Sequence, residues 1–300
     1  MPEKKSAKKK EHGKTVQPGA NRVHNDGLGD VWAALTGKNP AEIMPQVVAT
    51  VIEAGGTRAA WQWKSQGTEH ILMAWPQESP IRAAVLMAGP EAGRLKPISA
   101  VPLLEGSLND LTVEEVVPRA EGMGADVGCG VIDGKNPLWF YNPLYGRDKD
   151  DLTDGVTHTF WLAGAALGIR RALLDELTIT QGPRYEEYAA AWLEENPDKT
   201  RLDVPPLKVD VRGKRIIMPG RFFGEYEVRT AIEEVEDAMF DKMPVKILYL
   251  SFPFEDRPPL QFPLYASEFI LKGFKPEKGQ EIDAYVWLEG RIVDLPPANE

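Results

Sequence analysis

The sequence predicts an α+β protein in which an N-terminal mixed α/β region is followed by a small C-terminal β-barrel. In residues 221–300, short runs rich in β-branched and aromatic residues alternate with Pro and Gly turn signals. Before them, amphipathic helical patterns occur together with strand-like runs. The chain has 300 residues, of which 43% are hydrophobic, so it can bury one large core or two ordinary ones.

The N-terminal residues 1–22 form a basic segment in an acidic chain. Seven Lys or Arg residues against two Glu residues give the segment a charge of +5, while the whole chain carries −10. Because the segment has almost no apolar residues to bury, we expect a disordered solubilising tail, with residues 1–20 making no contact with the core. The acidic remainder argues against a broad surface that follows nucleic-acid phosphates.

Residues 23–200 are expected to form an α+β domain, with a division into two structural units within the domain as the alternative. After Asn39, apolar residues recur at steps of three and four from Pro40 to Ile52, and Gly55-Gly56 follows, which predicts a helix. The runs 71–75 and 81–88 are separated by two prolines and predict two strands joined by a tight loop. A helix followed by paired strands is typical of an α+β unit.

The glycine-rich segment 122–132 and the run 138–141 predict two further strands around a turn. The glycines come close to a dinucleotide-binding pattern, but the last one is a residue late and more strand follows. A phosphate-binding loop needs a helix at that point, so we do not expect nucleotide binding here.

The segment 148–155 is the densest acidic cluster of the chain. A calcium loop would need an oxygen ligand at its fifth position and glycine at its sixth, where this chain has Leu152 and Thr153. We therefore expect a solvated acidic turn, with loose metal binding as the alternative. Of the four histidines, only His158 lies next to this turn, and a structural role is favoured for it over that of a ligand or base. Whether the 148–158 segment forms a site is left open by the sequence.

Around the middle of the chain, the segment 157–171 fits either a helix or a strand, and its glycines favour a bent strand. The segment 183–195 predicts a helix that starts at a proline and ends before Asn196-Pro197. The main domain boundary is expected near residue 200, followed by a Pro-rich linker over 201–220.

The C-terminal unit, 221–300, is expected to be mainly β. Alternation predicts a strand from Tyr226 to about residue 236, although a helix over 228–240 is the alternative. The run 245–252 predicts a strong strand, and 264–272 a short helix with Ala266, Phe269 and Ile270 facing inward. The run 282–293 supplies the last strand, with a kink expected at Gly290.

This order of strands, short helix and closing strand resembles an oligonucleotide/oligosaccharide-binding (OB) fold. The resemblance implies a face where aromatic rings stack on a ligand and cations pair with phosphate. The candidate ligand-binding residues are Arg212, Lys214, Arg215, Arg221, Phe222, Phe223, Tyr226 and Trp287, with Tyr249 as a further stacking ring. The alternative is that these rings fill the barrel and the cations belong to a solvated linker, and we expect the Trp287 ring inside the barrel.

No pattern for catalysis, a metal or a cofactor emerges, so none of these is predicted. No apolar run approaches the roughly 20 residues of a membrane span, and the single cysteine agrees with a reducing compartment. We expect a soluble cytoplasmic binding or scaffold protein that is not an enzyme and whose partner is another protein, without a membrane role. Two alternatives remain, a single-stranded nucleic-acid binder and an enzyme whose site is assembled from scattered residues.

Overall fold

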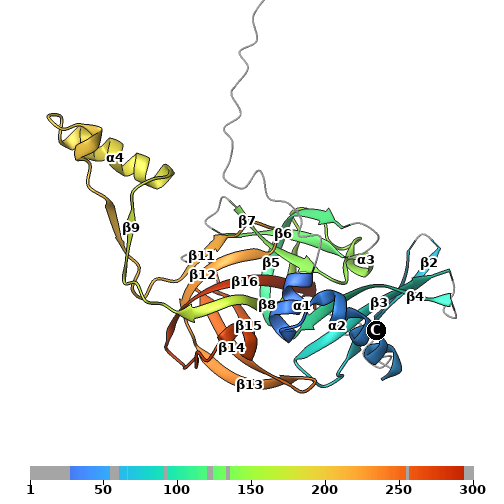
Figure 1. Ribbon diagram of the computed structural model, residues 1–300. Helices are drawn as coiled ribbons and strands as arrows, with labels where there is room; N and C mark the ends of the chain where they lie inside the picture. The colour runs from blue at the N-terminus through green and yellow to red at the C-terminus, as the bar shows by residue number, and fades with distance from the viewer. Residues whose placement is uncertain are drawn as a thin grey trace, which may run out of the picture.

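The computed structural model describes residues 28–54, 61–65, 67–90, 94–119, 124–132, 136–254 and 257–293. The predicted disordered tail, 1–22, lies outside these residues. The protein is mostly β, with a closed five-stranded barrel, a four-stranded sheet beside it and an arm that projects from the body (Figure 1).

The N-terminal layer consists of two helices and an antiparallel sheet in the order β1-β2-β3-β4. Its elements are α1 (Gly29–Thr36), α2 (Pro40–Glu53), β1 (Trp61–Ser65), β2 (Thr68–Trp75), β3 (Ile81–Gly89) and β4 (Lys96–Leu104). The predicted helix is confirmed: the Asn39 side chain caps α2 by accepting from the Ala41 N–H at 3.0 Å, and Pro40 starts its first turn. The two predicted strands are also confirmed and pair as β2 and β3.

The closed barrel is built from five strands, which are β5 (Ser107–Pro118), β6 (Ala125–Ile132), β7 (Asn136–Asn142), β8 (Thr157–Arg171) and β16 (Glu281–Ile292). The strand reading of 157–171 is confirmed, as is the strand pair predicted around 122–141. β16 pairs with β8 along its whole length and meets β7 in parallel at Glu289 and Tyr141, which closes the ring.

The barrel expected within 221–300 therefore takes four of its five strands from 107–171. Apolar periodicity indicates which segments are strands but not which segments pair, so the partner of β16 could not be found from the pattern. Five further strands extend the sheet. Next to β16 lie β12 (Glu225–Ala231) and then β11 (Ile216–Pro219), and next to β8 lie β15 (Leu260–Ser267), β14 (Met243–Phe252) and β13 (Glu234–Phe240).

Three C-terminal predictions need correction. The strand expected from 226 to about 236 is two strands, β12 and β13, which pair with different neighbours. The helix expected over 264–272 is reduced to α5 (Glu268–Leu271), because β15 runs to Ser267 in pairing with β14. Phe269, expected inward, is 52% exposed.

The last strand is confirmed as β16, but its irregularity is a register shift between Tyr285 and Val286 and not a kink at Gly290. Gly290 has a packing role, since a Cβ atom there would lie 2.6 Å from the Phe140 ring inside the barrel. The absent side chain thus makes room for an aromatic ring of the core.

The arm connects β8 with β11 and contains residue 200, the predicted boundary. It comprises β9 (Glu176–Ile179), α4 (Pro183–Glu195), a 3-10 turn at Arg201–Asp203 and β10 (Leu207–Asp210), so residues 201–220 include β10 and β11. The predicted helix 183–195 is confirmed as α4, and a small cluster around Tyr185, Ala189 and Val204 holds it to the strands. No described helix is long and apolar enough to cross a membrane.

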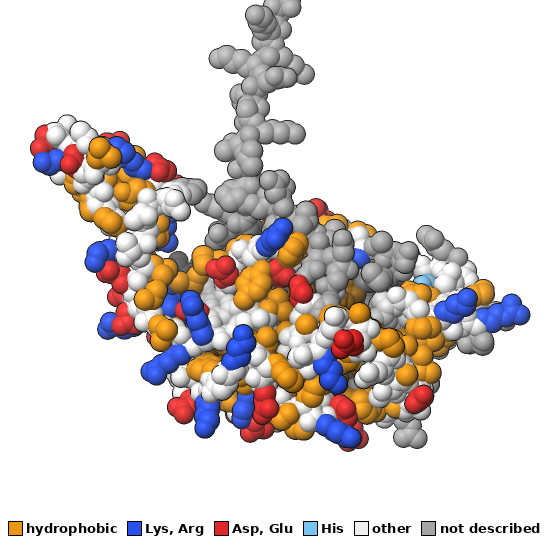
Figure 2. Space-filling view, viewed as in Figure 1, with side chains coloured by type: hydrophobic (Ala, Val, Ile, Leu, Met, Phe, Trp, Pro, Cys, Tyr) orange, Lys and Arg blue, Asp and Glu red, His pale blue; other side chains and the backbone are white. Residues whose placement is uncertain are grey.

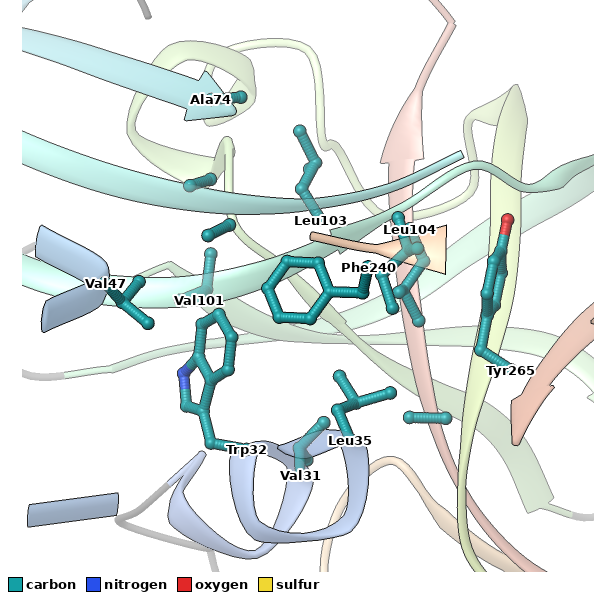
Figure 3. Packing of buried hydrophobic residues seen from close by; sticks show 14 of the residues in the cluster. Val31, Trp32, Leu35, Val47, Ala74, Val101, Leu103, Leu104, Phe240 and Tyr265 are labelled. Carbon is teal, nitrogen blue, oxygen red and sulfur yellow. The ribbon is translucent and has the colours of Figure 1, made fainter. Parts of the chain in front are cut away.

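Two large cores lie on opposite sides of the barrel wall. One fills the barrel and includes Phe140, Leu162 and Leu288. The other lies between the outer wall and the N-terminal layer, where Trp32 of α1 points toward Val101 and Phe240 (Figure 3), with 6.0 Å between the Trp32 and Phe240 ring centres.

Trp287 is buried, at 1% exposure, but it belongs to the second core and packs beside Tyr141 at 5.8 Å between ring centres. The expectation that its ring lies inside the barrel is wrong. Its neighbours Val286 and Leu288 point into the barrel, so the alternation of the strand turns Trp287 toward the N-terminal layer.

Candidate binding site

The predicted stacking residues do not form one open face. Tyr226 is fully buried, and its hydroxyl accepts from the Trp139 N–H at 2.6 Å and donates to the Trp139 carbonyl at 3.2 Å. Phe223 covers the Trp139 ring at 4.4 Å between centres. With Trp287 also buried, these three aromatic residues are engaged in internal packing.

The predicted cations are dispersed and mostly matched with carboxylates. Arg212 pairs with Asp175 at 2.7 Å, and Arg215 pairs with Glu233 at 2.6 Å while also donating to the Ser251 carbonyl at 2.6 Å. Lys214 is exposed on the turn before β11. The structure thus does not bring these side chains together into one basic surface.

Arg221 and Phe222 lie together at a different place. The guanidinium of Arg221 lies over the Phe222 ring, 5.1 Å from its centre. Both line a shallow hollow of about 460 Å³ that also contains Asp30 and Glu225. The two carboxylates make this hollow a poor place for a phosphate group.

A hollow of about 570 Å³ lies on a sheet face and is lined by none of the residues predicted to bind a ligand. Cross-strand register places side chains of four strands, β11, β12, β16 and β8, in two rows on this face. One row is Ile216, Arg229, Asp283 and Arg170, and the other is Met218, Glu227, Tyr285 and Gly168.

Gly168 makes the floor of this hollow deep. A Cβ atom built at Gly168 meets no atom of the described residues within 4 Å, so they leave the space above the backbone there open. Leu174, just before the arm, and Leu177 of β9 also line the hollow. The hollow therefore lies where the arm joins the barrel.

An ion pair fixes the arm to this face. Arg229 binds Asp283 through two hydrogen bonds of 2.7 and 3.2 Å, and its Nη1 donates to the Leu174 carbonyl at 2.7 Å. Arg229 is 7% exposed, and the bidentate geometry offsets the cost of burying its charge. Arg170 approaches the same carboxylate at 3.5 Å but keeps 72% of its side chain exposed.

Large apolar side chains remain exposed around the hollow. Leu173 is 76% exposed, Leu174 57%, Met218 48% and Leu177 37%, and the half-buried Ile216 completes the group. We call these five residues the arm-base surface. Figure 2 shows hydrophobic side chains along the arm and where the arm meets the body. In the sequence, the adjacent Leu173 and Leu174, between a predicted strand and a helix that begins at a proline, could have indicated the arm-base surface.

The acidic segment is more structural than expected. Asp148 is 3% exposed and forms an ion pair with Arg147, and Asn142 donates to it at 3.4 Å. Leu152 is buried in the barrel core. The expectation of a fully solvated turn is thus wrong for Asp148, whereas His158 contacts the Asp151 carbonyl at 2.9 Å at the surface end of β8.

Comparison with known proteins gives no relative from which a role could be transferred. No protein-family model matches the sequence, and no curated protein and no solved structure matches it significantly. The geometry of the arm-base surface is therefore the basis for assigning a function.

Proposed function

We propose that this protein is a non-enzymatic, cytoplasmic binding protein that recognises a partner protein at the arm-base surface. The observation that carries the proposal is the group of exposed leucine and methionine side chains around a hollow of about 570 Å³. Such a group exposes apolar area to water, and a partner that covers it recovers roughly 25 cal/mol per Å².

The barrel that supports this surface is, in our proposal, OB-like. Numbered in chain order, its strands close in the order first, second, third, fifth and fourth, and the third and fifth are parallel. In OB folds, the loop between the fourth and fifth strands is one of those that contact ligands. Here the arm emerges from the connection between β8 and β16, the fourth and fifth strands.

The hollow also indicates which partner chemistry fits. Its open floor above Gly168 accommodates one bulky apolar side chain, and Leu174 and Leu177 also line the hollow. Arg170 and Arg171 are exposed at the end of β8. We therefore propose a partner segment in which a bulky apolar residue stands next to an acidic one.

The charge arrangement supports a protein partner over single-stranded nucleic acid. Nucleic-acid binding requires several free cations along one path and open aromatic rings. Arg212, Arg215 and Lys208 each have a carboxylate partner within 3 Å. Rings of Tyr226 and Trp287 are buried, so stacking on them would need the core to open.

A photo-crosslinking experiment tests the proposal. Benzoylphenylalanine at position 218, beside the hollow, is expected to capture a partner from an extract of the native host. The same group at position 239, an exposed methionine on the opposite sheet edge, is the matched control and is expected to capture none of that partner.

A hollow-filling variant gives the second part of the test. Gly168→Leu adds a side chain where no described atom lies within 4 Å, so the fold should persist while the crosslink at position 218 disappears. Equal capture at both positions, or capture that Gly168→Leu leaves unchanged, contradicts the proposal. Retention on single-stranded DNA that falls steeply with salt would favour the nucleic-acid alternative.

A further inference from the structure

A second hollow, of about 400 Å³, lies at the seam between the N-terminal sheet and the barrel. Trp61 of β1, Arg82 of β3, Trp161 of β8 and Arg291 of β16 line it. Trp161 and Arg291 are cross-strand partners, so their side chains leave the barrel wall on the same face. We call this space the seam hollow.

Among the described residues that line the seam hollow, Arg82 is a charged residue with a buried polar atom that lacks a partner. Its Nε atom is buried and has no hydrogen-bond partner within the described part of the chain. No described ion pair includes Arg82 either. A guanidinium with a buried, unsatisfied N–H loses the hydrogen bonds that water would give it, so a ligand that accepts from it gains binding energy.

Glu289, deeper in the seam, does not supply the missing acceptor. It is 1% exposed, its Oε1 accepts from the Leu104 N–H at 3.3 Å, and its Oε2 has no described partner. Arg291 donates to the Leu104 carbonyl at 2.8 Å and lies 3.8 Å from Glu289. The carboxyl therefore lies near both guanidiniums without a close ion pair to Arg82.

Burial raises the pKa of Glu289 to about 8 although Arg291 and Arg82 lower it. The other ionisable groups that face it are Tyr141 of β7 and Tyr265 of β15, and burial raises the pKa of both phenols. At pH 7 Glu289 is therefore mainly neutral, so the charges of Arg82 and Arg291 are not balanced by it.

We propose that the seam hollow binds a small aromatic carboxylate, whose carboxylate group pairs with Arg82 and whose ring lies against Trp61 and Trp161. A carboxylate matches the planar fork of one guanidinium, and the two indoles offer flat apolar area for a ring. Glu78 and Glu105 line the same hollow, so a monoanion is favoured over a doubly charged phosphate.

Calorimetry with indole-3-acetate, tryptamine and inorganic phosphate tests this inference. Indole-3-acetate is expected to bind, whereas tryptamine, which has the same ring and a positive charge, and phosphate are not. Arg82→Gln is expected to weaken binding of indole-3-acetate about tenfold to a hundredfold, the effect of losing a charged hydrogen bond. Arg82→Lys should retain part of the affinity, and Arg184→Gln, on the exposed face of the arm, should retain all of it.

The pH dependence provides an independent readout. Binding should weaken as the pH rises from 7 to 9, because ionised Glu289 then competes with the ligand for Arg82, and Glu289→Gln should remove this decline. Should Arg82→Gln fail to fold, Trp161→Leu replaces it and is also expected to weaken binding. The inference is overturned if tryptamine binds as well as indole-3-acetate, or if Arg82→Gln or, in its place, Trp161→Leu leaves the affinity unchanged.

Discussion

The buried carboxyl of Glu289 should make the stability of this protein fall as the pH rises. Its pKa is 4.5 in an ordinary carboxyl of this type and about 8 in the fold. The folded state therefore binds the proton more tightly than the unfolded state, and the free energy of unfolding decreases between these two values. At about 1.4 kcal/mol per unit, this difference amounts to about 5 kcal/mol.

Glu289→Gln removes the ionisation and keeps a carbonyl oxygen for the Leu104 N–H. Urea unfolding of both proteins at pH values from 5 to 9 measures the effect. At pH 5 the two are expected to differ by no more than about 1 kcal/mol, the worth of one neutral hydrogen bond. Toward pH 8 the wild-type protein should lose several kcal/mol relative to the variant, and above that the difference should continue to grow only slightly.

Glu187→Gln, an exposed substitution on α4, is the control and should follow the wild-type profile. Parallel profiles for the wild-type protein and Glu289→Gln would refute the reasoning, because they would show that Glu289 ionises equally easily in both states. A wild-type protein that gains stability relative to Glu289→Gln as the pH rises would show that the two arginines outweigh burial.

Three further outcomes are expected. Trp287→Ala should lower the free energy of unfolding by about 3 to 5 kcal/mol in urea titrations. Phe269→Ala, which removes an exposed ring, should lower it by less than about 1 kcal/mol. A similarly small loss for Trp287→Ala would show that Trp287 does not lie in the core. Tyr226→Phe should cost about 1 to 3 kcal/mol in the same assay, since it leaves buried backbone groups of Trp139 unpaired. Arg229→Met should make the arm cleave faster in limited proteolysis, and unchanged cleavage would show that this ion pair does not hold the arm.

Local patterns predicted most of the individual elements. The Asn-Pro start of α2, the proline start of α4 and the alternation in β14 all depend on residues a few positions apart. The helix expected at 264–272 failed because cross-strand pairing with β14 overrides the local preference of a short apolar run. The spacing of apolar residues within a segment does not show which distant segment it pairs with. The barrel was therefore predicted within 221–300, although four of its strands come from 107–171.

The candidate sites were harder to find than the fold. Cations and aromatics that are close in sequence, such as Arg212 and Arg215, have partners in different strands of the structure. The seam hollow brings together Arg82 and Arg291, which lie far apart in the sequence. Its signal in the sequence was present but unused: Glu289 and Arg291 are charged residues at alternate positions of a strand that is otherwise mainly apolar.

The double pairing of β16 also sets the order in which this chain can fold. β16 pairs with β8 and with β12, and it is the last described strand. Until residues 281–292 have left the ribosome, β8 and β12 expose backbone edges that could associate with other chains. Contacts between distant segments lose chain entropy before they contribute stability. We therefore expect refolding to take milliseconds to seconds or longer and to follow the pairing of β16.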